Sequence, residues 1–281
     1  MHTFKQYYVL TKPGIIYGNL FAAIAGFFLA SRGDVSITLF IATMLGLSCI
    51  IASACVCNNI MDRKIDAKMM RTKRRALATG IITPFQAIVY GAVLGLVGSA
   101  ILIYFVNLLA WGVAILGWIG YVVVYGIAKR ITSYATEIGS IPGAMPPVVG
   151  YSAVTHTLDI TSLLLFTILV LWQMPHFFSL SLFQKNDYQK TGLPIVSTKK
   201  NEIYLRVASK IYIIGFVISG LFLFMYSHMG IVYLLFFCGL SLYWLHIAFR
   251  TAEKYWAKKI FMASLVVLAG WSAAVCIDSL L

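Results

Sequence analysis

Nine apolar stretches, each of about 20 residues and so long enough to cross a bilayer as a helix, follow one another along this chain of 281 residues. The runs are continuous rather than alternating, which argues against a porin-type β-barrel. We therefore predict an all-α integral membrane protein with nine transmembrane helices, forming one domain over residues 1–281. The predicted spans are 14–31, 35–57, 83–105, 108–128, 133–154, 160–182, 207–227, 230–249 and 260–278.

The composition agrees with lipid as the solvent. Hydrophobic residues make up 60% of the chain and charged residues 11%, against roughly 45–50% and about 25% in soluble domains. This balance excludes a soluble enzyme, a disordered protein and a disulfide-rich secreted scaffold. The cysteines lie within or at the end of apolar runs and lack the paired spacing of a zinc site, so we expect them to be structural. They are Cys49, Cys55, Cys57, Cys238 and Cys276.

The positive charge is distributed unevenly across the predicted membrane. The net charge of +13 would suggest nucleic acid as the partner of a soluble protein, but in a membrane protein basic residues collect in cytoplasmic loops. When the 22 basic residues are assigned to the predicted loops, all but Arg32 fall on one face. We therefore expect no nucleic-acid partner. We predict a multi-pass protein of the bacterial plasma (inner) membrane, with a cytoplasmic N-terminus, cytoplasmic long loops and an external C-terminus.

The first long cytoplasmic loop carries three oxygen-bearing side chains at helical spacing. Asn58, Asp62 and Asp66 recur every four residues, which places them on one face of a helix over roughly 12 Å. Carboxylate and amide oxygens are the ligands that Mg²⁺ takes, and its shell is often completed by water and substrate phosphate. The spacing favours a magnesium site at the cytoplasmic end of the second span.

Basic residues follow these acids directly, at Arg71, Lys73, Arg74 and Arg75. Carboxylates that hold a metal, followed by cations that hold phosphate oxygens, suit a metal–diphosphate complex. The alternative is a solvated loop whose acids pair with its own bases.

Two other clusters contain polar groups near or within spans. His176 lies inside the sixth predicted span, where ionisable groups are costly and often functional; the alternative is a histidine satisfied by a neighbouring helix. Asp187 and Lys190 follow at the cytoplasmic end of the same element.

Lys129 and Arg130 precede the fifth span, which holds Glu137 together with several prolines and glycines. That composition predicts a broken or closely packed helix beside a cavity. The prolines are Pro142, Pro146 and Pro147.

Together these segments resemble a known family. Asn58-x-x-x-Asp62-x-x-x-Asp66 followed by Arg71-Thr72-x-x-Arg75 is similar to the first aspartate-rich motif of the UbiA-type intramembrane prenyltransferases. The segments GSIPGAMPPVVG at 139–150 and WQMPHF at 172–177 resemble its haem-farnesylating branch, and the likeness runs from about residue 5 to 278. The sequence departs from the wider superfamily in having Asn59 where many members have Asp, and in keeping only Asp187 of the second aspartate cluster.

The resemblance implies a ring of nine helices around a central cavity and a chemistry for it. Farnesyl diphosphate would lose its diphosphate with the help of Mg²⁺, and the farnesyl group would be transferred to a vinyl group of haem B, giving haem O. The implied catalytic residues are Asp62, Asp66 and His176, and the implied metal ligands are Asn58, Asp62, Asp66 and Asp187. The implied diphosphate-binding residues are Arg71, Lys73, Arg75, Lys129, Arg130 and Lys190.

Some parts of this interpretation remain open at the level of sequence. His176 could contact haem iron or a propionate, or assist proton transfer. Membrane lipid is an expected partner, and a haem A synthase or a terminal oxidase is a candidate one. A UbiA-type prenyltransferase acting on a phenolic quinone precursor is the main alternative. A transporter that uses intramembrane acids is a second, although no inverted repeat is visible.

The predicted orientation can be tested by labelling single cysteines in a background without the native five. Cysteines at Lys68 and Lys190 should react only from the cytoplasm, and cysteines at Arg32 and His156 only from outside, because the basic face is retained inside. A membrane-permeable reagent should label all four. The reverse pattern would show that the spans are counted wrongly.

Overall fold

The computed structural model describes residues 2–250 and 253–281, and within this part of the chain all regular structure is helical. The longer elements are α2 (Pro13–Ser31), α3 (Ile37–Asp66), α5 (Pro84–Phe105), α6 (Leu108–Ile119), α10 (Ile160–Phe183), α13 (Glu202–Tyr226), α14 (Ile231–Arg250) and α15 (Glu253–Leu280). The shorter ones are α1 (His2–Leu10), α4 (Ala76–Thr79), the π-helical segment η1 (Gly120–Tyr125), α7 (Gly126–Ile131), α8 (Ala135–Gly143), α9 (Met145–Thr155), α11 (Lys185–Gln189) and α12 (Val196–Lys199).

Within the described residues, eight helices are long and apolar enough to cross a membrane, counting α6, η1 and α7 as one. They match eight of the nine predicted spans, and the protein is a multi-pass membrane protein. The remaining predicted span, 133–154, is divided between α8 and α9, and neither part is long enough alone. Of the two expectations for this segment, a broken or a closely packed helix, the structure shows the break, whereas the count of nine stays a prediction.

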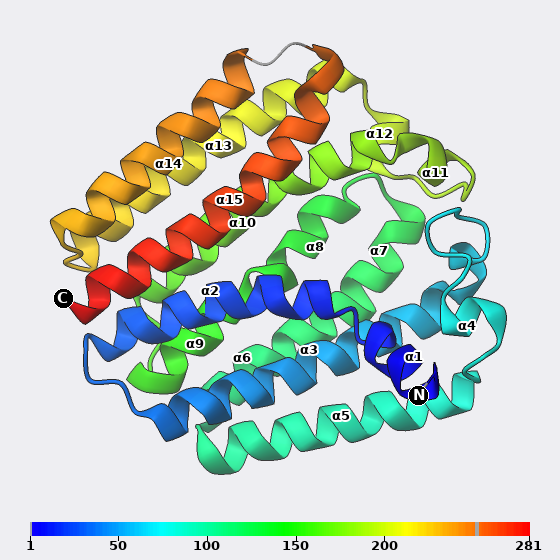
Figure 1. Ribbon diagram of the computed structural model, residues 1–281, viewed down its shortest axis with the longest axis horizontal. Coiled ribbons are helices and arrows are strands. Elements are labelled where there is room, and N and C mark those ends of the chain that lie inside the picture. The colour runs from blue at the N-terminus through cyan, green and yellow to red at the C-terminus, as the bar shows by residue number, and fades with distance from the viewer. Residues whose placement is uncertain (1, 251–252) are drawn as a thin grey trace.

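Prolines explain where the segment breaks. Pro142 lies in the last turn of α8, and α9 begins with Met145 followed by Pro146 and Pro147. A proline has no N–H to donate and its ring clashes with the preceding turn, so it favours the end or the beginning of a helix. The α8 helix packs against η1 and α9 packs against α6, so the pair runs back along the preceding span (Figure 1).

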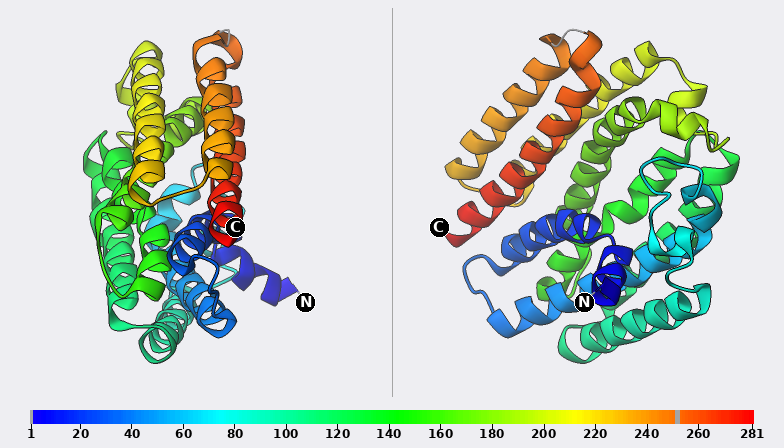
Figure 2. Two further views of the ribbon diagram at one scale, coloured as in Figure 1. Left: turned by 90° about the vertical axis from the view of Figure 1, so that its left-hand side faces the viewer. Right: turned by 45° about the vertical axis from the view of Figure 1, so that its right-hand side comes forward.

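The central cavity predicted from the resemblance is present, but only some of the helices line it. Its walls come from α2, α3, the α6–η1–α7 span, α8, α9, α10 and α15, together with α11 and the loops that follow α3 and α11. The α5, α13 and α14 helices contribute no lining residue. They pack outside, α5 against α3, α13 against α10, and α14 against α15 and α13. Figure 2 shows these outer helices and the short α1, which projects from the side of the bundle.

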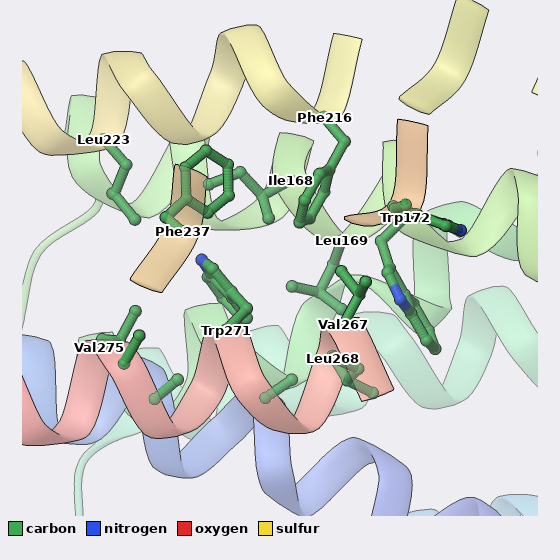
Figure 3. Packing of buried hydrophobic residues seen from close by; sticks show 14 of the residues in the cluster. Ile168, Leu169, Trp172, Phe216, Leu223, Phe237, Val267, Leu268, Trp271 and Val275 are labelled. Atoms are coloured by element: carbon green, nitrogen blue, oxygen red, sulfur yellow. The ribbon is translucent and has the colours of Figure 1, made fainter. Parts of the chain in front are cut away.

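Two apolar clusters hold the walls together. One joins α10, α13, α14 and α15 through large side chains, including the fully buried Phe216, Phe237 and Trp271 (Figure 3). The other joins α2, α3, α6 and α9 around Phe27 and Ile50. The two halves meet where α15 and α10 contact α2, so that the walls close around the cavity.

Glycines allow α2 and α9 to touch backbone to backbone. A Cβ added at Gly26 would collide with the carbonyl oxygen of Pro147, and one at Gly150 with that of Ala23. Small residues permit close helix packing in membranes, where contact rather than hydrophobic burial drives association. This approach fixes one wall of the cavity.

The contact predicts that Gly26→Ala and Gly150→Ala destabilise the protein. Overpacking typically costs about 1–3 kcal/mol, so the melting temperature of the purified protein in detergent should fall by several degrees. Gly18→Ala on α2 is the matched control, because its Cβ would meet nothing within 4 Å. Since alanine also favours the helix, this variant should melt at the same temperature or higher. Equal losses in all three variants would contradict the close contact.

Candidate active site

The end of α3 carries the three oxygen-bearing residues that the sequence places on one face. The helix continues to Asp66, beyond the predicted span end at residue 57. Asn58, Asp62 and Asp66 all line one cavity of about 470 Å³, which also reaches His176. The helical spacing therefore brings these side chains to the same wall, as expected.

Asp62 is paired with two cations of α7, at the end of the α6–η1–α7 span. Its Oδ2 lies 2.6 Å from Nζ of Lys129, and its Oδ1 lies 3.2 Å from Nη2 of Arg130. The Asp62 and Lys129 side chains are only 15% and 7% exposed. Such a buried charge is tolerated when an opposite charge accompanies it. The ion pair joins α3 to α7 at the mouth of the cavity.

Asp66, the last residue of α3, is paired with an arginine of the loop before α4. Nη1 of Arg75 lies 2.9 and 2.8 Å from the two Asp66 carboxylate oxygens and 3.3 Å from Oδ1 of Asn59. The Thr72 hydroxyl donates to the Asp66 backbone carbonyl, and Asn59 donates from Nδ2 to the Leu10 carbonyl. The loop thus folds back onto α3. Asn59, noted in the sequence only as a departure from the family pattern, anchors this arrangement.

Lys12 is the cation that faces Asn58, the third oxygen-bearing residue. Its Nζ donates to Oδ1 of Asn58 at 3.0 Å. Burial lowers the pKa of Lys12 to about 8, because removing the ammonium from water disfavours its charged form. The Nδ2 group of Asn58 is buried without a hydrogen-bond partner among the described residues. Sequence reasoning counted Lys12 only among the basic residues of the cytoplasmic face.

Asp187 lies apart from this group. Its Oδ2 accepts a hydrogen bond from the Arg71 backbone N–H at 3.3 Å, and its Oδ1 lies 3.8 Å from Nζ of Lys190. It does not line the cavity. In the described part of the chain, no three His, Cys, Asp or Glu side chains lie close enough together to hold one metal ion. The structure therefore brings Asn58, Asp62 and Asp66 to one wall and places Asp187 in the contact between the two long loops.

The predicted diphosphate-binding cations divide into two groups. Those that line the cavity are Arg71, Arg75 and Lys129. Those outside the lining are Lys73, Arg130 and Lys190, of which Lys73 and Lys190 are exposed to solvent. Only the first group can meet a ligand inside the cavity without movement of the chain.

Aromatic residues near the mouth escaped sequence reasoning. Tyr121 and Tyr125 stack with ring centroids 5.5 Å apart, and Lys129 Nζ lies 5.3 Å from the centre of the Tyr125 ring. Tyr188 also lines the cavity, and burial raises the pKa of its phenol. The spacing of Tyr121 and Tyr125, one turn apart, was the available signal.

His176 forms part of the cavity wall and is held rigidly. Its ring stacks on Trp172 with centroids 5.1 Å apart and lies 4.9 Å from the Phe261 ring. Its Nδ1 lies 2.8 Å from the Ser264 hydroxyl of α15. The partner from a neighbouring helix that the alternative interpretation required is present, and it engages only one ring nitrogen. Nε2 has no recorded hydrogen bond in the described chain.

Glu137 faces away from the cavity. Thr136 and Gly139 of α8 line it, whereas Glu137 does not. One Glu137 carboxylate oxygen, Oε2, is buried without a hydrogen-bond partner among the described residues. Glu137 is therefore not part of the cavity wall.

The oxygen atoms at the cavity mouth are ligands of the type that a magnesium ion prefers. Asn58, Asp62 and Asp66 offer hard oxygen atoms along one side of the cavity mouth, and Mg²⁺ usually needs only one or two protein carboxylates because water and phosphate complete its shell. Each of these side chains now faces a nitrogen cation, so the wall already balances its negative charge with positive charge. A divalent ion would take over part of that balance.

Comparison with known proteins places this arrangement in a family. The protoheme IX farnesyltransferase of Sodalis glossinidius is 42% identical over 280 residues, covering 98% of this chain and 94% of that protein. A structure described as digeranylgeranylglyceryl phosphate synthase superposes with a TM-score of 0.81 at 17% identity, covering 100% of this chain and 99% of that one. A UbiA homologue from Archaeoglobus fulgidus bound to GPP and Mg²⁺ superposes with a TM-score of 0.65 at 14% identity, covering 96% and 99%.

These structural likenesses establish the fold. The profile of the UbiA prenyltransferase family matches residues 19–273, which include every residue that lines the cavity except Lys12, Gly14, Ile15 and Gly18. With that match and the 42% identity over nearly the whole chain, the protein belongs to the UbiA prenyltransferase family and is a prenyltransferase enzyme.

Proposed function

We propose that the protein transfers the farnesyl group of farnesyl diphosphate to a vinyl group of haem B, giving haem O. The observation that carries the proposal is a row of three oxygen-bearing side chains, each facing a cation from another segment, at the mouth of an apolar cavity that extends to His176. One end of such a site suits a metal diphosphate and the other an apolar chain. The name of the 42%-identical relative supports haem as the acceptor.

The polar end would bind the diphosphate. Mg²⁺ held by Asn58, Asp62 and Asp66 would supply positive charge against the leaving group when bound. Arg71, Arg75 and Lys129 line the same space and can donate to phosphate oxygens. The solved UbiA homologue with GPP and Mg²⁺ supports a metal diphosphate as the ligand class.

The ion pairs suggest how the site prepares for this ligand. In the structure Lys129 and Arg75 are engaged by Asp62 and Asp66. A metal ion on the carboxylates would free these cations to donate to the diphosphate. The total charge of the site would then stay balanced as the ligand enters, which avoids leaving a charge unpaired at the membrane edge.

The apolar part of the cavity would hold the farnesyl chain and protect the reacting carbon. Its lining includes Ile50, Trp118 and Leu169 beyond the polar mouth. Ionisation of the C–O bond gives an allylic cation, and exclusion of water prevents its early hydrolysis. The faces of Tyr121 and Tyr125 can stabilise such a cation through their π-systems.

The acceptor end lies around His176. The vinyl group of haem B would attack the allylic carbon and form the new C–C bond, and water would add to the resulting cation with loss of a proton. The balanced reaction consumes farnesyl diphosphate, haem B and water, and releases haem O and diphosphate. With Nδ1 near Ser264, Nε2 is the nitrogen left to face a ligand. It would contact iron, accept the proton or donate to a propionate.

The proposal also includes a cellular setting. The site would face the cytoplasm of a bacterium from its plasma membrane, with the C-terminus outside, since the basic loops of the mouth follow the positive-inside rule. Membrane lipid would surround the outer helices. A haem A synthase or a terminal oxidase is the candidate partner that would take up the product.

The metal-binding wall can be tested with isosteric variants. Asp62→Asn and Asp66→Asn should each lower turnover of farnesyl diphosphate and haem B by at least about 100-fold, because charge compensation worth several kcal/mol is lost. Haem O formed by the purified protein would be measured by mass spectrometry over a Mg²⁺ titration. Asp34→Asn is the control, being an exposed carboxylate beyond the far end of α2. Normal turnover in both site variants at low Mg²⁺ would refute the assignment.

Variants at the diphosphate end and at the His176 end of the cavity should lose the binding of different substrates. His176→Ala should weaken haem B retention or shift its absorption spectrum, with little change in the affinity for farnesyl diphosphate, because His176 lies in the wall formed by α10 and α15. Asp62→Asn should do the reverse. Ser264→Ala, which removes only the partner of Nδ1, should alter the haem spectrum more mildly than His176→Ala. If His176→Ala and Asp62→Asn lose diphosphate binding equally and keep normal haem spectra, a phenolic acceptor would be favoured over haem.

A further inference from the structure

A second hollow lies between α14 and α15, away from the central cavity. It encloses about 860 Å³ and shares no lining residue with the cavity. Its walls come from the last two turns of α14 and the first turns of α15, near the top of Figure 1. We refer to it as the basic groove.

The groove is built from two matching helical stripes. On α14 its residues are Tyr243, His246, Ile247 and Arg250, and on α15 they are Tyr255, Lys258, Lys259 and Met262. Both sets follow the spacing i, i+3, i+4, i+7, which places each set on one face of its helix. Since α14 and α15 pack against one another along their lengths, the two stripes form the two sides of one hollow.

This face of α15 points away from the active site. Phe261 and Ser264 contact His176, and Leu268 lines the cavity. At about 100° per residue, Ser264 and Leu268 lie more than 100° around the helix from Lys259 and Met262. The prenyl transfer chemistry therefore makes no use of the groove.

The groove lies at the same end of the bundle as the active-site mouth. The far end of α15 is fixed near the ends of other helices, because Asp278 accepts the backbone N–H groups of Gly230 and Tyr233 at the start of α14. Gly33, just beyond α2, also approaches Ser279. The first turns of α15 must then lie at the opposite end, where α2 begins directly after Lys12.

The three cations of the groove are exposed, and none of them forms an ion pair with a side chain that the structure describes. The ion pairs found in the described chain involve Asp62, Asp66, Asp187 and Glu202, and none includes Arg250, Lys258 or Lys259. Two tyrosines stand beside them, Tyr243 at 44% and Tyr255 at 53% exposure. Tyrosine and basic side chains together are typical of the headgroup level of a membrane.

An apolar path leads from the groove towards the bilayer centre. The α14 stripe continues through Gly239, where an added Cβ would meet nothing within 4 Å, and through Phe236, which is 55% exposed. The α15 stripe continues through Val266, which is 52% exposed. A ligand with an anionic head and an apolar tail fits this surface along its whole length. A free phosphate or an acidic peptide would use only the basic end.

We propose that the basic groove binds an anionic membrane phospholipid. Its phosphodiester lies between Arg250, Lys258 and Lys259, and an acyl chain runs along the exposed faces of α14 and α15. Basic pockets between transmembrane helices on the cytoplasmic side recognise such headgroups through charge and hydrogen bonds. The bound lipid would brace α15, the helix whose opposite face holds His176 through Ser264.

Native mass spectrometry of the full-length protein in detergent tests this proposal. The protein is titrated with phosphatidylglycerol, with phosphatidylcholine as the neutral lipid. The groove variant is Arg250→Gln, Lys258→Gln and Lys259→Gln combined. The matched control is Lys5→Gln, Lys185→Gln and Lys199→Gln, which removes the same charge from the same predicted face outside the groove. We expect the groove variant to lose phosphatidylglycerol affinity about tenfold or more, and the control to keep it.

Three outcomes would overturn the proposal. Equal losses in the two triple variants would show diffuse surface attraction instead of a site. Equal binding of phosphatidylcholine would remove the role of the charges. Displacement of the lipid by millimolar inorganic phosphate would identify a free-phosphate site.

If the groove variant does not yield folded protein, the single variants Lys258→Gln and Lys259→Gln replace it. Each should lose affinity about fivefold, and no loss in either would count against the site.

Discussion

The ion pairs of Asp62 with Lys129 and of Asp66 with Arg75 are the contacts on which the mouth of the cavity depends. A carboxylate near the edge of a bilayer loses much of its hydration, and this loss is tolerated only where a positive charge is close. Each pair joins the end of α3 to another segment, α7 in one case and the loop before α4 in the other. The same charges that close the structure are therefore the ones that a metal diphosphate would engage.

A second constraint comes from the membrane itself. A backbone group inside lipid must find its partner within the protein, so an interrupted helix is stable there only when other helices cover the break. The α8–α9 segment meets this condition, because α2, α6, η1 and α10 all pack against it. Its prolines end one helix and begin the next, and Gly26 and Gly150 let α2 come into backbone contact with α9. The cavity is bounded by this covered break.

The α15 helix contacts the proposed substrate site with one face and lines the basic groove with another. Towards the cavity, Ser264 fixes one nitrogen of His176 and Phe261 packs on its ring. Away from the cavity, Lys258 and Lys259 face a groove without an acidic partner among the described residues. At the mouth, Arg75, Lys129 and Arg130 are paired with carboxylates of the protein, whereas the cations of the groove are available to the membrane. This difference in pairing separates the proposed substrate site from the proposed lipid site.

The sequence by itself determined the features that depend on local periodicity and on transfer into lipid. Apolar runs predicted eight of the long spans, prolines predicted the break near Pro142, and four-residue spacing placed Asn58, Asp62 and Asp66 on one face. It did not determine which cation meets which oxygen, because Lys12, Lys129 and Arg75 are separated from their partners by 46, 67 and 9 residues. Nor could it place Asp187 in a contact with the Arg71 backbone or Ser264 beside His176. Only tertiary packing decided these contacts, since they join segments whose separation along the chain carries no periodic signal.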